Sequence, residues 1–158
     1  MLNKTARRWL RLFHLIMVAN LIGGFLSIYI ISTITGLSTS ALFVANRSIH
    51  TLFNSLITLS FYGVVASGLV FSLFSHWEFT KHWWIIGKWV GTLVIFTLVW
   101  VWLGPVISGL VALSDTARSS AIDASQYASF QSQLGLSIFI LLALLLVLII
   151  ITFLNPGV

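Results

Sequence analysis

The chain has 158 residues, of which 59% are hydrophobic and only 7% are charged, and its formal net charge is +5. A soluble domain carries roughly 25% charged residues, so this chain could not cover a water-facing surface, and its composition predicts an integral membrane protein. The positive charge would suggest nucleic acid in a soluble protein, but the basic residues stand mostly beside apolar segments, and we expect no nucleic-acid partner. The chain contains no cysteine, which excludes disulfides, zinc–thiolate sites and iron–sulfur ligation within it.

Four apolar stretches reach the length of about 20 residues that a helix needs to cross the hydrocarbon core of a bilayer. The expected spans are residues 9–31, 46–74, 83–103 and 134–154. Pro105 follows the third span, where a helix can stop or kink at modest cost. Two broad connections, 32–46 and 111–130, are rich in Ser, Thr and Ala, whereas the short loop 75–82 makes the second and third spans antiparallel neighbours. We predict an all-α fold, an integral membrane four-helix bundle that forms one domain over residues 1–158.

The basic residues indicate how the bundle is oriented. One side carries five of them and the other carries two, namely Lys4, Arg7, Arg8, Arg11 and Lys81 against Arg47 and Arg118. Lys and Arg gather in cytoplasmic segments, so both termini are expected to be cytoplasmic. The alternative is that the first span is a cleaved signal peptide that ends near "GLSTSA". Its apolar run is longer than the about 7–15 residues of a signal-peptide core, which argues against that alternative.

Small residues mark where helices are expected to touch. Ser60, Gly63 and Ser67 share one stripe of the second span, and Gly87 and Gly91 form a small-xxx-small pair in the third. Such positions permit close backbone approach in lipid. They support a packed bundle and carry no information about chemistry.

Two ionisable residues fall inside the expected spans, His14 in the first and Lys88 in the third, each about five residues from the cytoplasmic end. With a rise of about 1.5 Å per residue, both lie at a similar depth of about 7–8 Å. Placing an ionisable group in a membrane span costs free energy, so each such residue is first considered as part of a functional site. His14 is a structural hydrogen-bonding group, a metal or haem ligand, or a proton carrier. Lys88 snorkels to the headgroups, ligates haem, or binds an anionic group such as a propionate.

A third histidine, His50, stands near the outer end of the second span. Arg47, His50 and Asn54 are spaced at i, i+3 and i+7, so they line one helical face. His50 is expected to be a wet, interfacial residue. The alternative is a second ligand or propionate site on the outer side, with Arg47 pairing to a carboxylate. The expected spans contain no Asp or Glu, which argues against a carboxylate proton relay.

Two sequence segments carry a family resemblance. "RRWLRLFH", with a histidine early in the first helix, and "HWWIIGKWVGTL", with a lysine early in the third, resemble a superfamily of small bacterial membrane proteins. It includes the copper-resistance D proteins, the haem-dependent protoporphyrinogen oxidases and an uncharacterised four-helix branch. The ending of this chain, "IIITFLNPGV", is similar to that of the uncharacterised branch. The resemblance implies that His14 and Lys88 are the positions associated with haem b. The oxidase pattern is not found in the second span, and the only methionines are Met1 and Met17, too few for a copper(I) site.

The leading hypothesis is therefore a membrane haem b-binding protein with a redox or electron-transfer role at the cytoplasmic leaflet of the bacterial inner (plasma) membrane. His14 and Lys88 are its expected metal ligands, Lys88 being alternatively a propionate contact, and Arg11, one turn from His14, is positioned to hold a propionate. The alternative is a non-catalytic structural or partner-binding membrane subunit without a cofactor, and a third is a small oligomeric transporter. The expected partners are the lipid bilayer and a second copy or a membrane redox partner. Whether the protein is an enzyme stays open.

Overall fold

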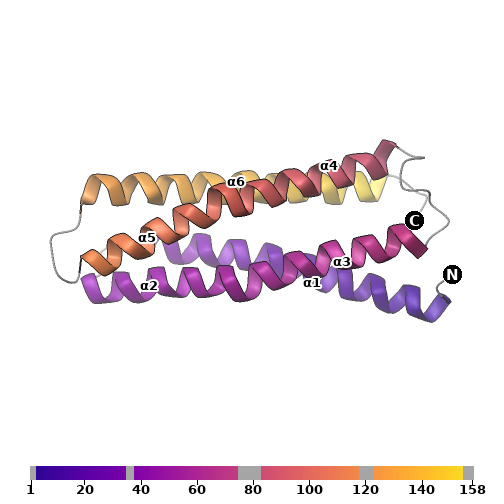
Figure 1. The fold of residues 1–158 in the computed structure, drawn as a ribbon, viewed down its shortest axis with the longest axis horizontal. Helices are drawn as coiled ribbons and strands as arrows, with labels where there is room; N and C mark the ends of the chain where they lie inside the picture. Colours follow the sequence, from indigo (N-terminus) through magenta and orange to yellow (C-terminus); the bar gives the residue numbers. More distant parts are fainter. Residues whose placement is uncertain (1–2, 35–37, 75–82, 118–122, 155–158) are drawn as a thin grey trace.

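The structure is a computed structural model that describes residues 3–34, 38–74, 83–117 and 123–154, and its helices run along one common axis (Figure 1). In chain order the elements are α1 (Lys4–Ser32), α2 (Thr39–Leu52), η1 (Phe53–Ile57), α3 (Thr58–Phe74), α4 (Trp83–Thr97), η2 (Leu98–Leu103), α5 (Gly104–Thr116) and α6 (Ala124–Leu154). Four continuous helical runs are long and apolar enough to cross a membrane, Lys4–Ser32, Thr39–Phe74, Ile85–Thr116 and Ala124–Leu154. The predicted all-α four-helix bundle is thereby confirmed.

The helices continue well beyond the expected apolar spans. α2 begins at Thr39, where the Ser38 hydroxyl accepts a hydrogen bond from the Ala41 backbone N–H at 3.4 Å. α5 runs through Pro105, which stands in its first turn, where a missing N–H is tolerated. α6 begins at Ala124, ahead of its apolar run. The prediction of broad connections is wrong over 39–46, 111–116 and 124–130, which are helical.

Two π turns interrupt the second and third helices near their middles. η1 joins α2 to α3, and η2 joins α4 to α5. The Thr58 hydroxyl donates to the Phe53 carbonyl at 3.0 Å, so a side chain satisfies an acceptor in the wide turn. A Cβ atom on Gly104 would lie 3.6 Å from the Phe53 ring, so the first residue of η1 lies against the start of α5. π turns break the regular helix locally and often occur near functional sites.

The core is apolar along the middle of the bundle. α1 packs against α3 and α6, α5 packs against α2 and α6, and α4 packs against α6. Between α3 and the third helix, the Trp100 ring stacks on Phe96 with centroids 4.8 Å apart and meets the edge of Phe61 at 4.9 Å. Aromatic pairs at such separations add about 0.5–1.5 kcal/mol beyond their buried area. These rings fill the crossing of the second and third helices.

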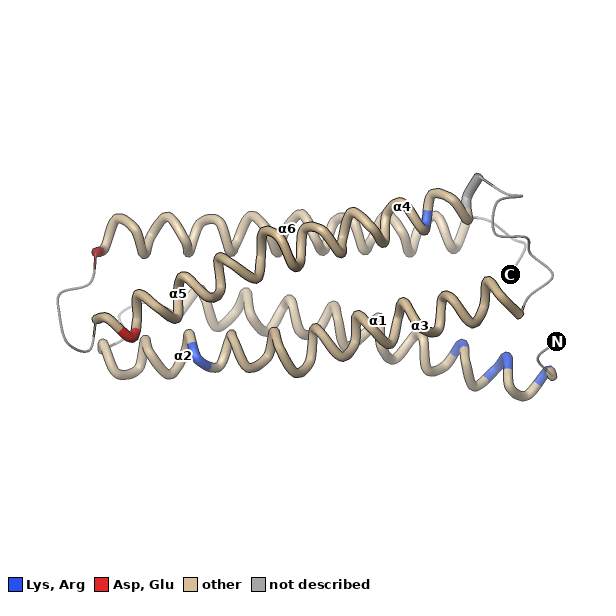
Figure 2. Tube along the Cα trace, viewed as in Figure 1, with Lys and Arg blue, Asp and Glu red and all other residues tan. Residues whose placement is uncertain are grey.

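The charges divide between the two ends of the bundle (Figure 2). α1 begins and α6 ends at the same end, which we call the basic end; it also holds the end of α3 and the start of α4 (Figure 1). Four cationic residues of α1 and Lys88 of α4 lie there, whereas Arg47, Asp115 and Asp123 lie toward the opposite end, the far end. Lys81 and Arg118 lie outside the described residues.

Candidate functional site

His14 stands on the face of α1 that packs into the bundle. Leu21 and Phe25 follow it by seven and eleven residues, spacings that share one face of an α-helix. Both of these side chains are buried, with 1% and 0% of their surface exposed. His14 itself is half-buried. Its imidazole therefore points toward the interior near the basic end.

Lys88 occupies the equivalent position on α4. Ile95 and Val99 follow it by the same seven and eleven residues, and both are buried. Lys88 is half-buried. The two groups thus face the same interior from helices that run in the same direction (Figure 1).

A hydrogen bond fixes the imidazole against α3. The Nδ1 atom of His14 lies 2.7 Å from the Oγ atom of Ser67, a buried residue. The Ser67 hydroxyl in turn donates to the carbonyl groups of Gly63 and Val64, at 2.6 and 3.0 Å. Because a carbonyl can only accept, the hydroxyl proton is engaged there, and the Ser67 oxygen accepts from His14. This network favours the tautomer that carries the proton on Nδ1 and keeps the lone pair of the neutral imidazole on Nε2.

The surroundings of this pair are close-packed on one side. A Cβ atom on Gly63 would lie 2.8 Å from the Met17 side chain, so α1 and α3 approach closely just beyond His14. The Phe71 ring meets the imidazole edge-on, with centroids 6.3 Å apart. α1 and α3 therefore hold His14 as one packed unit.

An apolar groove of about 280 Å³ lies between α3 and α4. Its lining residues are Phe61, Val65, Trp89, Thr92, Leu93 and Phe96. Thr92 stands one turn after Lys88 and donates its hydroxyl to the Lys88 carbonyl at 2.8 Å. The groove therefore begins on the same stretch of α4 that carries the lysine.

Arg11 is at the same end but on another surface. It precedes His14 by three residues on α1, and its side chain is exposed. The structure therefore places His14 and Lys88 on inward faces near the basic end and leaves Arg11 at the rim.

His50 and Arg47 do not join this arrangement. Seventeen residues separate His50 from Ser67 along one nearly continuous helix, which at about 1.5 Å per residue is roughly 25 Å. The Asn54 amide nitrogen lies 3.2 and 3.1 Å from the two ring nitrogens of His50, and Arg47 is exposed. These residues form a separate polar face near the far end. Within the described ranges, no group of three or more His, Cys, Asp or Glu side chains is placed to hold a metal ion.

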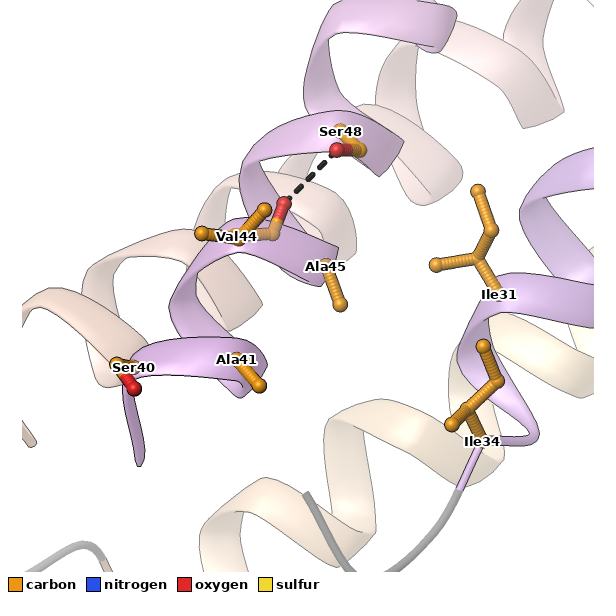
Figure 3. Close-up of a pocket in the computed structure, with 7 residues that line it drawn as sticks. All are labelled: Ile31, Ile34, Ser40, Ala41, Val44, Ala45 and Ser48. Carbon is orange, nitrogen blue, oxygen red and sulfur yellow. Dashed lines mark hydrogen bonds between the residues drawn. The ribbon is translucent and has the colours of Figure 1, made fainter. Parts of the chain in front are cut away.

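A second hollow, of about 500 Å³, opens near the far end between the end of α1 and the start of α2 (Figure 3). The Ser48 hydroxyl there donates to the Val44 carbonyl at 2.9 Å. Its lining is Ile31, Ile34, Ser40, Ala41, Val44, Ala45 and Ser48. No titratable side chain lines it, so it offers no chemistry to compare with the His14 site.

Two polar residues that form hydrogen bonds between helices were not predicted to do so from the sequence. The sequence identified Ser67 only as a position where helices pack. It lies seven residues before Phe74, at nearly the depth of His14, and this match in depth could have identified it as a partner of His14. Asn46 was placed at the start of a span, and it is buried beside Tyr127 of α6, with its Nδ2 atom 3.4 Å from the phenol oxygen. No sequence signal links residues 81 positions apart.

Comparison with known proteins gives no match, since no family model, curated protein or solved structure is similar to the chain. The family resemblance and the haem ligands that it implies stay predictions.

Proposed function

We propose that this protein is a multi-pass protein of the bacterial inner membrane, with both termini in the cytoplasm, that binds haem b and serves a redox or electron-transfer role at the cytoplasmic leaflet. His14 is the residue that would bind the haem iron. The observation that carries the proposal is the contact of 2.7 Å between His14 and Ser67.

That contact supports the proposal through the state of the imidazole. A histidine that ligates iron must be neutral, and in metal sites its other ring nitrogen usually donates to a neighbouring acceptor that fixes the ring orientation. Ser67 is such an acceptor for Nδ1, and Nε2 keeps the lone pair that a metal requires. Ser67 thus acts as a positioning residue for His14.

Lys88 and Arg11 supply the positive charge that a haem would need around its carboxylates. Lys88 faces the interior beside His14 and is proposed as a partner ligand or as the contact for one propionate. Arg11 lies at the rim, one turn from His14, where a guanidinium can pair with a second propionate. His50 and Arg47 would form a separate outer site.

The apolar groove between α3 and α4 is the proposed seat of the macrocycle. Its rings and aliphatic side chains would suit the apolar edge of a macrocycle. Its volume of about 280 Å³ lies just below the range of about 300–1,000 Å³ that ligand pockets cover. When bound, haem supplies one-electron redox chemistry, which the side chains of this chain cannot perform.

The test is a reduced-minus-oxidised absorption spectrum of protein purified after expression with ample haem. We expect Soret and α bands in the wild type and in His50→Ala, and their loss in His14→Ala. A colourless wild type, or a signal that survives in His14→Ala, would overturn the proposal. A signal lost only in His50→Ala would move the site to the far end.

A non-catalytic structural or partner-binding subunit is the second candidate. The same hydrogen bond favours it, because Ser67 already satisfies one nitrogen of the imidazole and ties α1 to α3. In lipid such a bond between helices contributes about 0.6 kcal/mol on average. This candidate predicts a colourless protein in which His14→Ala and Ser67→Ala lower stability by similar amounts.

A further inference from the structure

We propose that the first turns of α1 form a binding site for an anionic phospholipid, in which Lys4 and Arg8 hold the phosphate and Leu12 and Ile16 contact an acyl chain. These four residues are spaced four apart, so they form one column along the helix surface. The site shares no residue with the proposed haem site and does not depend on it.

All four side chains of the column are exposed. Leu12 has 46% of its surface exposed and Ile16 has 47%, and Lys4 and Arg8 are also open. No described part of the chain covers this face. In a membrane, Leu12 and Ile16 would face lipid chains wherever no other protein covers them, and the two cations would face headgroups and water.

A second column beside the first repeats the same order. Arg7 and Arg11 are exposed, and Leu15 follows Arg11 by one turn with 64% of its surface exposed. Trp9, 67% exposed, stands beside Arg8 at the same level, as interfacial tryptophans do. The face therefore changes from cationic to apolar along the helix in two adjacent columns.

The positive charge of this face has no described carboxylate near it. The first turn of α1 contains no acidic residue, and the carboxylates of the described ranges, Asp115 and Asp123, lie toward the far end (Figure 2). A phosphodiester complements a guanidinium through two parallel N–H···O bonds. The start of a helix adds a partial positive charge of the same sign.

The order of the residues selects a lipid over a soluble anion. Each step of four residues advances about 6 Å along the helix, so the column spans the distance from a headgroup to the upper part of an acyl chain. An acidic peptide or a polyanion would contact Lys4 and Arg8 but would leave Leu12 and Ile16 exposed. An anionic phospholipid contacts all four.

The experiment is native mass spectrometry on delipidated, detergent-purified protein titrated with phosphatidylglycerol or with phosphatidylcholine of the same acyl chains. We expect the wild type to retain phosphatidylglycerol preferentially. Each Lys or Arg near an anionic surface contributes about a fivefold gain, so Lys4→Gln/Arg8→Gln should weaken phosphatidylglycerol retention by roughly 30-fold. Arg47→Gln, which removes an exposed arginine near the far end, is the matched control and should retain it fully.

Two further variants separate the lipid from other anions. Lys4→Arg/Arg8→Lys keeps both charges and should retain the lipid, and Leu12→Ser/Ile16→Ser should weaken retention because the chain contact is lost. Equal retention of both lipids by the wild type would overturn the proposal. So would unchanged retention in the glutamine variant, or displacement of the lipid by an acidic peptide with no effect of the serine variant.

Discussion

The Nδ1 atom of His14 lies 2.7 Å from the hydroxyl oxygen of Ser67, and this hydrogen bond joins α1 to α3 where their backbones approach closely. The Ser67 hydroxyl also lies within hydrogen-bond distance of two backbone carbonyls, to which it can donate, so the network favours the tautomer with the ring proton on Nδ1.

We predict that His14 carries its proton on Nδ1 and not on Nε2 at neutral pH. The measurement is the pair of side-chain ¹⁵N chemical shifts in protein labelled at histidine and prepared without haem, with His14→Ala used to assign the signal. His50, whose two ring nitrogens both lie near Asn54, provides a comparison within the same sample. A His14 ring protonated on Nε2 would contradict the network.

Gly109 is predicted to tolerate no side chain. A Cβ atom there would lie 2.7 and 2.8 Å from two atoms of the Phe130 ring, and a ring cannot yield as a flexible chain does. Gly109→Ala should therefore lower the free energy of unfolding by about 1–3 kcal/mol, as overpacking does. The midpoint of thermal unfolding in detergent micelles measures this loss.

Gly23→Ala is the matched control, because nothing lies within 4 Å of the added methyl group. It should be neutral or slightly stabilising, since alanine favours a helix more than glycine does. Adding Phe130→Leu to Gly109→Ala should recover part of the loss. If both glycine variants behave alike, the contact between α5 and α6 is not as close as described.

Asn46 and Tyr127 should be energetically coupled. Asn46 is 3% exposed, and its Nδ2 and Oδ1 atoms lie 3.4 and 3.5 Å from the Tyr127 hydroxyl. Tyr127→Phe leaves this buried amide without that partner and should cost about 1 kcal/mol, the low end of the range for an unsatisfied buried group because the contacts are long. A double-mutant cycle with Asn46→Leu checks it, and strictly additive losses would refute the coupling.

The start of α6 is predicted to weaken in acid. The Ser125 hydroxyl, and after it the Gln126 backbone N–H, lower the pKa of Asp123 below its ordinary value. A group with a lowered pKa stabilises the folded state above the unfolded pKa, here about 3.9, and this stabilisation is lost as the pH falls through the folded value. The protection factors of the Ser125 and Gln126 amides against hydrogen exchange should therefore fall below about pH 4 in the wild type. In Asp123→Asn the same amides should exchange with no such acid step.

Much of the architecture could be read from the sequence because lipid imposes simple rules. Four apolar stretches of sufficient length predict four helices, and the structure confirms them. The equal depth of His14 and Lys88 followed from helix rise alone, and their spacing to Leu21 and Ile95 places both on inward faces.

The rest depends on contacts between helices, which the sequence does not encode locally. The partnership of His14 with Ser67 requires a particular rotation of α1 against α3, and a serine in a small stripe serves packing equally well. The wide turn at Phe53–Ile57 left no readable sequence signal. The helix over residues 39–46 was not predicted, because Ser, Thr and Ala occur in both loops and helices.

The early start of α6 gives the far end a shape that hydropathy alone would not suggest. Residues 124–133 add ten helical residues before the apolar segment 134–154, an overhang of about 15 Å. This helical extension lies beside α5 and α2 at the far end (Figure 1) and contacts α2 through Tyr127. It therefore offers antibody fragments an ordered helical surface beyond the apolar segment.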